Sequence, residues 1–227
     1  MLVVGFPAQA FGTNCFVVAS GPGEQCVVVD PGIGVIDQLD SVLTEHRLHP
    51  AAVLLTHGHL DHTFSVTPVC KARGVTAYIH PRDREMLADP TKAMSIDTRA
   101  MFGGLEWSEP DEIAEMTDGI VLEIAGLSIL VDHAPGHTGG SVMFRLSTSQ
   151  EPLCFSGDVL FRDSIGRTDL PGGDLSEMMA SLRDKVLTLP DETVVLPGHG
   201  PQTSIARERA HNPFLREAMG SSPQRGH

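Results

Sequence analysis

Basic residues are scarce in this chain of 227 residues. It contains 16 lysines and arginines against 29 aspartates and glutamates, which gives a formal net charge of −13 at pH 7. Nucleic acids and anionic membranes are polyanions, so this excess of negative charge argues against both as partners. We expect most of the charge to lie on an acidic, soluble surface.

Cysteines and long apolar runs are also few. Cys15, Cys26, Cys70 and Cys154 are widely spaced, and each lies in or beside an apolar segment, which favours buried reduced thiols over a disulfide framework. No apolar run approaches the roughly 20 residues of a membrane span. The first residues, Met-Leu-Val-Val-Gly-Phe-Pro, lack the basic segment of a signal peptide. We therefore expect a cytoplasmic protein.

Histidine and aspartate, by contrast, are concentrated in four short motifs. They are Thr-His-Gly-His-Leu-Asp-His (56–62), Pro-Gly-His-Thr-Gly-Gly-Ser (135–141), Ser-Gly-Asp (156–158) and Pro-Gly-His-Gly (197–200). A lone histidine is usually a solvated or structural ring, but this grouping predicts metal ligands. Imidazole and carboxylate suit zinc, iron and manganese.

The first motif has the spacing to serve two ions. His57 and His59 follow the apolar run at 51–55, and we expect them to face one ion from a loop at a strand end. Gly58 would permit an unusual backbone turn between them. Asp61 and His62 then have the reach to face a second ion.

Short strands and helices alternate along the chain without a dividing linker, which predicts one domain over 1–227. The apolar patterns predict a hairpin of Phe16–Ala19 with Cys26–Val29 and a second hairpin of Ile120–Ile124 with Leu127–Val131. Further strands are expected at Ala51–Thr56, Val75–Ile79, Val142–Leu146, Leu153–Ser156 and Val194–Leu196. Helices are expected at Val35–Leu48, His62–Arg73 and Leu175–Leu189, with Asp174 and Glu177 as an acidic capping pair.

The segment 83–118 breaks this rhythm, because Met86, Met94, Met101 and Met116 are scattered among acidic residues, glycines and Trp107. It is either a lid whose flexible methionines adapt to a ligand or an insertion of surface helices that pack them inward. At the other end, 220–227 is expected to be a disordered tail.

The four motifs together resemble those of the metallo-β-lactamase superfamily, from about Gly12 to His199. The residues themselves indicate only mixed strands and helices. The resemblance implies an α/β (α+β) fold, a four-layer αββα sandwich in which two facing mixed β-sheets carry outer helices.

The resemblance also implies two divalent metals, with zinc expected first and iron or manganese as alternatives. His57, His59 and His137 would hold the first metal. Asp61, His62 and His199 would hold the second, and Asp158 would bridge them. Asp30, in Asp-Pro-Gly, would orient ligands, although an aspartate before proline is also a common turn former.

Within the superfamily, Phe-Arg-Asp-Ser-Ile-Gly-Arg-Thr-Asp-Leu-Pro-Gly-Gly-Asp (161–174) is similar to the short bacterial hydrolases of the glyoxalase II type. These cleave thioesters of small thiols such as S-lactoylglutathione. Only 28 residues follow His199, whereas long glyoxalase II enzymes add a helical domain that contributes to the glutathione pocket. Arg167 either binds a substrate carboxylate or pairs with Asp169 or Asp163.

The resemblance therefore implies hydrolysis of a small thiol ester by a metal-activated hydroxide, with Asp61 and Asp158 as catalytic carboxylates. The alternative is a persulfide dioxygenase, a related branch that shares Gly-Arg-Thr-Asp (166–169) and uses one ferrous ion. His57, His137 and Asp158 would then hold the iron. The bridging aspartate disfavours a β-lactamase, and the acidic surface disfavours a ribonuclease.

Overall fold

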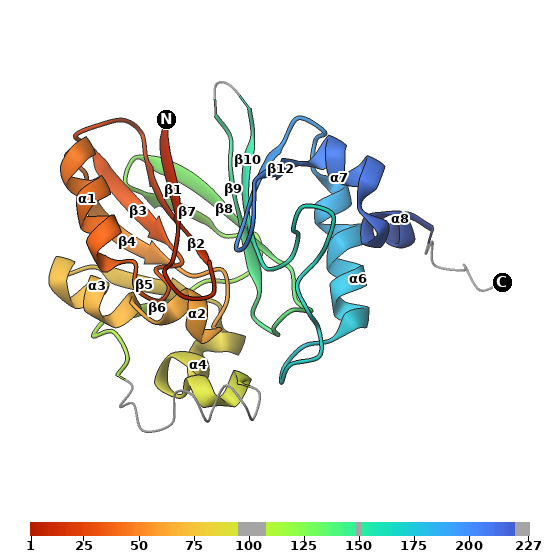
Figure 1. Cartoon of the computed structure of the whole chain (residues 1–227), viewed down its shortest axis with the longest axis horizontal. Helices are drawn as coiled ribbons and strands as arrows, with labels where there is room; N and C mark the ends of the chain where they lie inside the picture. Colours follow the sequence, from red (N-terminus) through yellow and green to blue (C-terminus); the bar gives the residue numbers. More distant parts are fainter. Residues whose placement is uncertain (95–107, 149–150, 221–227) are drawn as a thin grey trace.

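The computed structural model describes residues 1–94, 108–148 and 151–220. Within these residues the chain forms two six-stranded sheets, ordered β1-β2-β3-β4-β5-β6 and β12-β11-β10-β9-β8-β7. The sheets lie between two groups of helices (Figure 1). The four-layer αββα sandwich implied by the resemblance is confirmed.

The first sheet comprises the N-terminal strands. They are β1 (Leu2–Pro7), β2 (Asn14–Ala19), β3 (Gln25–Val29), β4 (His49–Leu54), β5 (Thr76–Ile79) and β6 (Ile113–Glu115). The pairs β1-β2 and β2-β3 are antiparallel, and β3, β4, β5 and β6 are mutually parallel. Parallel strands end at the same edge of a sheet, so the residues after β3, β4 and β5 gather there.

The second sheet comprises the C-terminal strands. They are β7 (Val121–Ile124), β8 (Leu127–His133), β9 (Val142–Leu146), β10 (Leu153–Gly157), β11 (Val194–Pro197) and β12 (Thr203–Ser204). Only β10 and β11 pair in parallel in this sheet. Their carboxyl ends therefore lie together, and each leads into one of the histidine or aspartate motifs.

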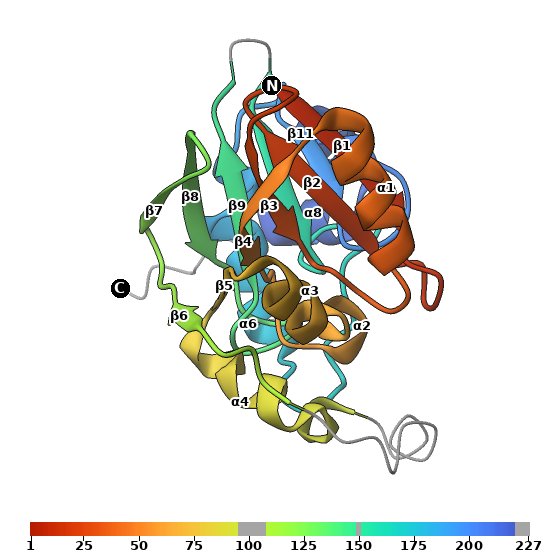
Figure 2. The ribbon, with the colours of Figure 1, turned by 90° about the vertical axis from the view of Figure 1, so that its left-hand side faces the viewer.

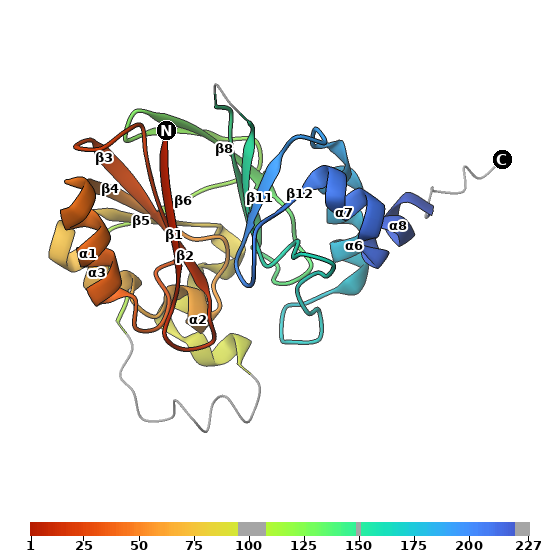
Figure 3. The ribbon, with the colours of Figure 1, turned by 45° about the horizontal axis from the view of Figure 1, so that its top comes forward.

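Helices cover the outer faces of both sheets. Figure 3 shows α1 (Ile36–His46) and α3 (Val66–Arg73) beside the first sheet, and α6 (Leu175–Asp184), α7 (Ile205–His211) and α8 (Pro213–Gly220) beside the second. Short helical turns complete the described chain. They are α2 (Leu60–Thr63), η1 (Pro81–Asp83), α4 (Arg84–Ala88), η2 (Pro90–Ala93) and η3 (Val186–Thr188). In Figures 1 and 2, α2 and α4 lie at the same end of the first sheet.

The central core lies between the two sheets. Val18, Val29 and Leu54 of the first sheet belong to the same buried cluster as Phe144 and Val131 of the second. Phe16 meets Phe155 edge to face with ring centroids 5.2 Å apart, a geometry that aromatic pairs favour. Two further clusters lie beneath the outer helices. Burial of apolar area on both faces of each sheet is the main driving force for this arrangement.

Both predicted hairpins and the strands that precede the motifs are confirmed. Two helices differ from expectation. The helix predicted at His62–Arg73 is interrupted, because α2 ends at Thr63 and α3 begins at Val66. The helix predicted to reach Leu189 ends at Asp184 and continues as the η3 turn, and Asp174 caps its first turn by accepting from the Glu177 amide at 2.9 Å. Strands β1, β6 and β12 and the helices α7 and α8 were not predicted.

The described part of segment 83–118 contains α4, η2 and β6, and it buries Met86, Met94 and Met116. Met101 and Trp107 lie outside the described residues, as does the predicted tail beyond Gly220, the last residue of α8. The four cysteines are buried and unpaired, as expected. No helix in the described ranges has the length and apolarity needed to cross a membrane.

Phe155 tests the central core. Phe155→Ala would leave a cavity between the sheets, and we expect it to lower the free energy of unfolding by about 3–5 kcal/mol in urea titrations. Met219→Ala, at a side chain 47% exposed on α8, is the control and should change it by less than about 0.5 kcal/mol. Equal effects of the two substitutions would contradict this assignment of the core.

Candidate metal centre

The seven predicted ligand residues lie where strands of the two sheets end at one shared edge. His57 and His59 follow β4, and Asp61 and His62 belong to α2. His137 lies in the loop after β8. Asp158 directly follows β10, and His199 lies just after β11.

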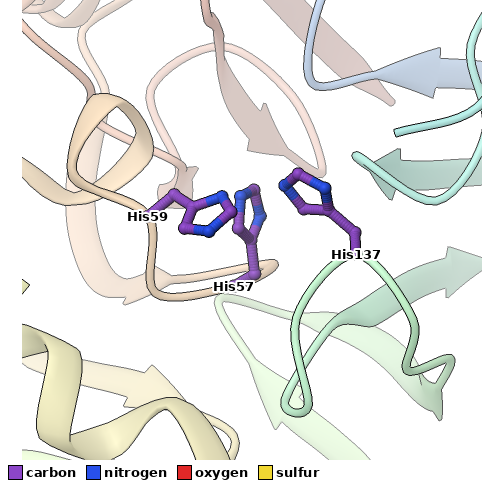
Figure 4. Close-up of side chains that lie close together, drawn as sticks. All are labelled: His57, His59 and His137. Carbon is purple, nitrogen blue, oxygen red and sulfur yellow. The ribbon is translucent and has the colours of Figure 1, made fainter. Parts of the chain in front are cut away.

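The first group of donors consists of His57, His59 and His137. Their rings turn toward one another from two different loops (Figure 4), with centroids 4.5–4.8 Å apart. One nitrogen from each lies within 4.8 Å of the others, and all three residues are buried. This is a spacing that a single cation can bridge.

The second group consists of Asp61, His62 and His199. The Nε2 atoms of His62 and His199 are 3.2 Å apart, and His199 Nε2 lies 3.1 Å from Asp61 Oδ2. Asp61 Oδ2 also lies 3.5 Å from His62 Nε2 and accepts a hydrogen bond from Thr13 Oγ1 at 2.9 Å. Thr13 was not identified from the sequence, because nothing in its spacing connects it to the motifs.

Asp158 lies between the two groups. Its Oδ2 atom is 3.4 Å from His137 Nε2, and its Oδ1 atom is 3.4 Å from His62 Nε2. One ligand atom each from Asp158, His57 and His62 form a further cluster within 4.8 Å. A carboxylate in this position can contact two ions at once.

The buried donor atoms fit metal ions better than they fit any partner in the protein. The Nε2 atoms of His57, His59 and His137 and Oδ1 of Asp158 are buried without a hydrogen-bond partner among the described residues. Buried polar atoms are nearly always paired in native proteins. A cluster of three ring nitrogens and a carboxylate oxygen, all aimed inward, therefore fits a site for divalent cations.

Contacts behind the rings select the tautomer that a metal needs. His137 Nδ1 donates to the carbonyl of Arg167 at 2.8 Å, and His57 Nδ1 lies 3.1 Å from Thr56 Oγ1. That hydroxyl donates to Asp30 Oδ2 at 2.6 Å, so it accepts from His57. With the proton on Nδ1, Nε2 keeps its lone pair for a cation.

The electrostatics also favour cations. Burial and the neighbouring rings hold the pKa of His57 well below its ordinary value, and burial, chiefly, lowers the pKa of His59 to about 3. Both rings are therefore neutral near pH 7, the form that ligates metal. Burial opposes charge on His62, but Asp61, Asp158 and Asp30 raise its pKa to about 10. The same three carboxylates would attract a divalent ion.

Asp30 lies directly after β3, where its backbone adopts φ = 49°. Its buried carboxylate accepts from the Thr56 amide at 2.8 Å and lies 3.0 Å from His62 Nδ1. Asp30 thus contacts His62 directly and His57 through the Thr56 hydroxyl.

The prediction that Gly58 permits an unusual backbone turn between His57 and His59 is wrong. Gly58 is not among the residues with positive φ, so no unusual turn requires a glycine. A Cβ at this position would instead lie 2.7 Å from Met86 Sδ and 3.1 Å from Asp83 Cβ. A larger residue is also excluded at Gly198, because an added Cβ there would lie 2.2 Å from Asp158 Oδ1. These glycines leave space for the packing around the ligands.

A cavity of about 420 Å³ opens over both groups of donors. Besides the ligands, most of its wall is apolar and includes Phe11, Met94 and Phe161. Arg167 also lines the cavity, but its Nε and Nη2 atoms donate to the two carboxylate oxygens of Asp169, each at 2.7 Å. The site therefore combines clustered metal ligands with a mainly apolar chamber.

Comparison with known proteins agrees with this geometry. The family model described as "Metallo-beta-lactamase superfamily" matches residues 8–199. The chain is 37% identical to "Probable metallo-hydrolase YqgX" of Bacillus subtilis, over 92% of this chain and 95% of the relative. It is 32% identical to "Hydroxyacylglutathione hydrolase GloC" of Haemophilus influenzae, again over 92% of this chain and 95% of the relative.

Two solved structures are also similar. BLEG-1, a B3 metallo-β-lactamase, superposes with a TM-score of 0.82 at 36% identity, covering 94% of this chain and 99% of that one. TTHA1623 in a di-iron-bound form superposes with a TM-score of 0.77 at 36% identity, covering 93% of this chain and 100% of that one. On the motifs, the fold and the family match, the chain belongs to the metallo-β-lactamase superfamily.

Proposed function

We propose that this protein is a binuclear metallohydrolase that cleaves a small thiol ester. The observation that carries the proposal is the pair of donor groups joined by Asp158 at the base of the cavity. The superfamily generally comprises metal-dependent hydrolases, and the relative from Haemophilus influenzae is named as a hydroxyacylglutathione hydrolase. Zinc is the metal we expect, and the di-iron form of TTHA1623 supports iron as the alternative.

Two divalent cations, when bound, would supply Lewis acidity that brings the pKa of water toward about 7 and polarises a carbonyl. His57, His59 and His137 would hold one cation, and Asp61, His62 and His199 the other, with Asp158 shared. In the reaction, water oxygen forms a bond to the acyl carbon and the carbon–sulfur bond breaks. The products are a carboxylic acid and a thiol.

Asp61 would orient the attacking water or take a proton from it while it ligates the second cation. Its side chain is 24% exposed, and it lines the cavity. Burial alone would raise its pKa, but the His62 and His199 rings and the Thr13 hydroxyl hold that pKa well below its ordinary value. Thr13 also fixes one of its oxygens, which orients the carboxylate.

The cavity wall supports an organic substrate of modest charge. Its described lining is largely apolar, and Arg167 is the only lysine or arginine within that described lining. The guanidinium is already paired with Asp169, so a substrate carboxylate must compete for it. We propose that Arg167 binds such a carboxylate when the ion pair with Asp169 opens.

The main experiment combines a thioester panel with elemental analysis of the same preparation. We expect about two metal ions per chain and hydrolysis of a thiol ester, followed by release of free thiol. One iron per chain together with oxygen uptake on glutathione persulfide would instead establish the dioxygenase. Because BLEG-1 is named as a B3 metallo-β-lactamase, a β-lactam belongs in the panel, and turnover of it alone would refute the thiol ester proposal.

Asp158→Ala tests the bridging assignment. Loss of the carboxylate that contacts both groups should reduce bound metal below two per chain and lower kcat/KM for the thiol ester by at least about 100-fold. Metal content and hydrolysis are measured on one sample. Asp184→Ala, at an exposed residue that pairs with Arg183, is the control. A variant that keeps two metals and full turnover would disprove the assignment.

Arg167 and Asp169 form a matched pair for testing carboxylate recognition. Arg167→Ala should raise KM for S-lactoylglutathione by about fivefold at nearly constant kcat, since an exposed ion pair contributes about 1 kcal/mol. Asp169→Asn frees the guanidinium and should lower KM by a similar factor. Neither change should alter KM for a thiol ester without carboxylates. If neither variant changed KM for S-lactoylglutathione relative to the unsubstituted protein, the contact would be excluded.

A further inference from the structure

Asp83 is a fully buried carboxylate that belongs to neither group of metal donors. It is the last residue of η1, directly before α4, and its side chain is 0% exposed. Among the described residues no lysine or arginine forms an ion pair with it. Burying an unpaired carboxylate is costly unless hydrogen bonds compensate, so the contacts of Asp83 indicate what it does.

Those contacts join the two loops that carry the first donor group. Asp83 Oδ2 accepts from the Gly58 amide at 2.9 Å and from Thr138 Oγ1 at 2.6 Å, and Oδ1 accepts from the Gly140 amide at 2.7 Å. Gly58 lies between His57 and His59, and Thr138 directly follows His137. One side chain thus receives hydrogen bonds from both sides of the three-histidine group.

The two glycines permit this close approach. A Cβ at Gly140 would lie 2.6 Å from Asp83 Oδ1, and one at Gly58 would lie 3.1 Å from Asp83 Cβ. Neither glycine has a positive φ that would by itself require the residue. Their small size therefore serves the packing of both loops against Asp83.

We propose that Asp83 is a positioning residue that holds His57, His59 and His137 in their metal-binding arrangement by tying the two loops together. The three rings come from separate parts of the chain, one pair after β4 and one after β8. Ligands fixed in place before the ion arrives bind it more tightly, because less conformational entropy is lost. The inference rests on the metal centre and not on the identity of the substrate.

Asp83→Asn is the informative variant. An amide keeps one acceptor oxygen but turns its NH₂ group toward Gly140 or toward Gly58 and Thr138, so at least one hydrogen bond becomes a donor–donor contact. Loss of a contact that orients ligands typically weakens metal binding by about 10–100-fold. A purely structural role would instead weaken both donor groups together.

Two backgrounds separate the donor groups. His199→Ala leaves the first group intact, and His59→Ala leaves the second intact. Zinc dissociation constants are measured in each background by competition with a chromophoric chelator. Asp83→Asn should raise the constant about 10–100-fold in the His199→Ala background and less than about threefold in the His59→Ala background.

Glu208→Gln is the control for a change at another buried carboxylate, because Glu208 is likewise 0% exposed and accepts from the Asp163 amide and Asn212 Nδ2. Unlike Asp83, Glu208 also pairs with an arginine, Arg207. It should lower thermal stability without a selective loss of zinc at the first group. Equal losses in the two backgrounds, or a folded Asp83→Asn with unchanged constants, would overturn the proposal. Both results are zinc dissociation constants and do not depend on thiol ester turnover. Failure of the proposed function would instead appear in the thioester panel, so the two failures can be distinguished.

Thr138 provides a second route if Asp83→Asn does not fold. Thr138→Val removes one donor to Asp83 and should weaken zinc binding several-fold at the first group only, whereas Thr138→Ser keeps the hydroxyl and should restore it. Cobalt substituted for zinc should report the same difference in its visible absorption, which depends on ligand geometry. Equal zinc affinity in the valine and serine variants would count against the role of Asp83.

Discussion

Four inward-facing ligand atoms without a hydrogen-bond partner are the constraint on which the rest of this structure depends. Nε2 of His57, His59 and His137 and Oδ1 of Asp158 are buried and make no hydrogen bond within the described part of the chain. Contacts behind them keep them so, since the Arg167 carbonyl and the Thr56 hydroxyl occupy the opposite nitrogens of two rings. Leaving these buried atoms without hydrogen bonds destabilises the fold, and binding of a cation would offset that loss.

The centre exists only when both sheets are packed. The first sheet contributes the histidines after β4 and the residues of α2, and the second contributes His137, Asp158 and His199. The sheets are joined at this edge by the Asn14 amide, which donates to the Gly198 carbonyl at 2.7 Å, and by Asn14 Nδ2, which donates to the Pro197 carbonyl at 2.9 Å. Metal binding and docking of the sheets are therefore coupled, because a ligand that binds only the folded state stabilises it.

The sequence predicted what short-range patterns encode and missed what depends on distant contacts. The hairpin at Ala125-Gly126 and the strands before each motif followed from local composition, and the motifs themselves indicated the donors. The break between α2 and α3 was missed because the apolar pattern continues through it. Asp83 and Thr13 have no local signature. Each acts through residues far along the chain, at Gly140 and Asp61, so only the fold reveals them.

Within the cavity, the groups proposed to hold metal differ from the group proposed to recognise the substrate. The donors beneath it are set by buried hydrogen bonds, whereas its only described lysine or arginine, Arg167, is 59% exposed and is paired with Asp169, which is 68% exposed. An exposed ion pair of this kind is weak, so its opening costs little. Arg167 is nevertheless connected to the centre through its carbonyl, which accepts from His137. One residue thus presents its backbone to His137 and its side chain to the cavity, so the guanidinium can change while the backbone contact stays in place.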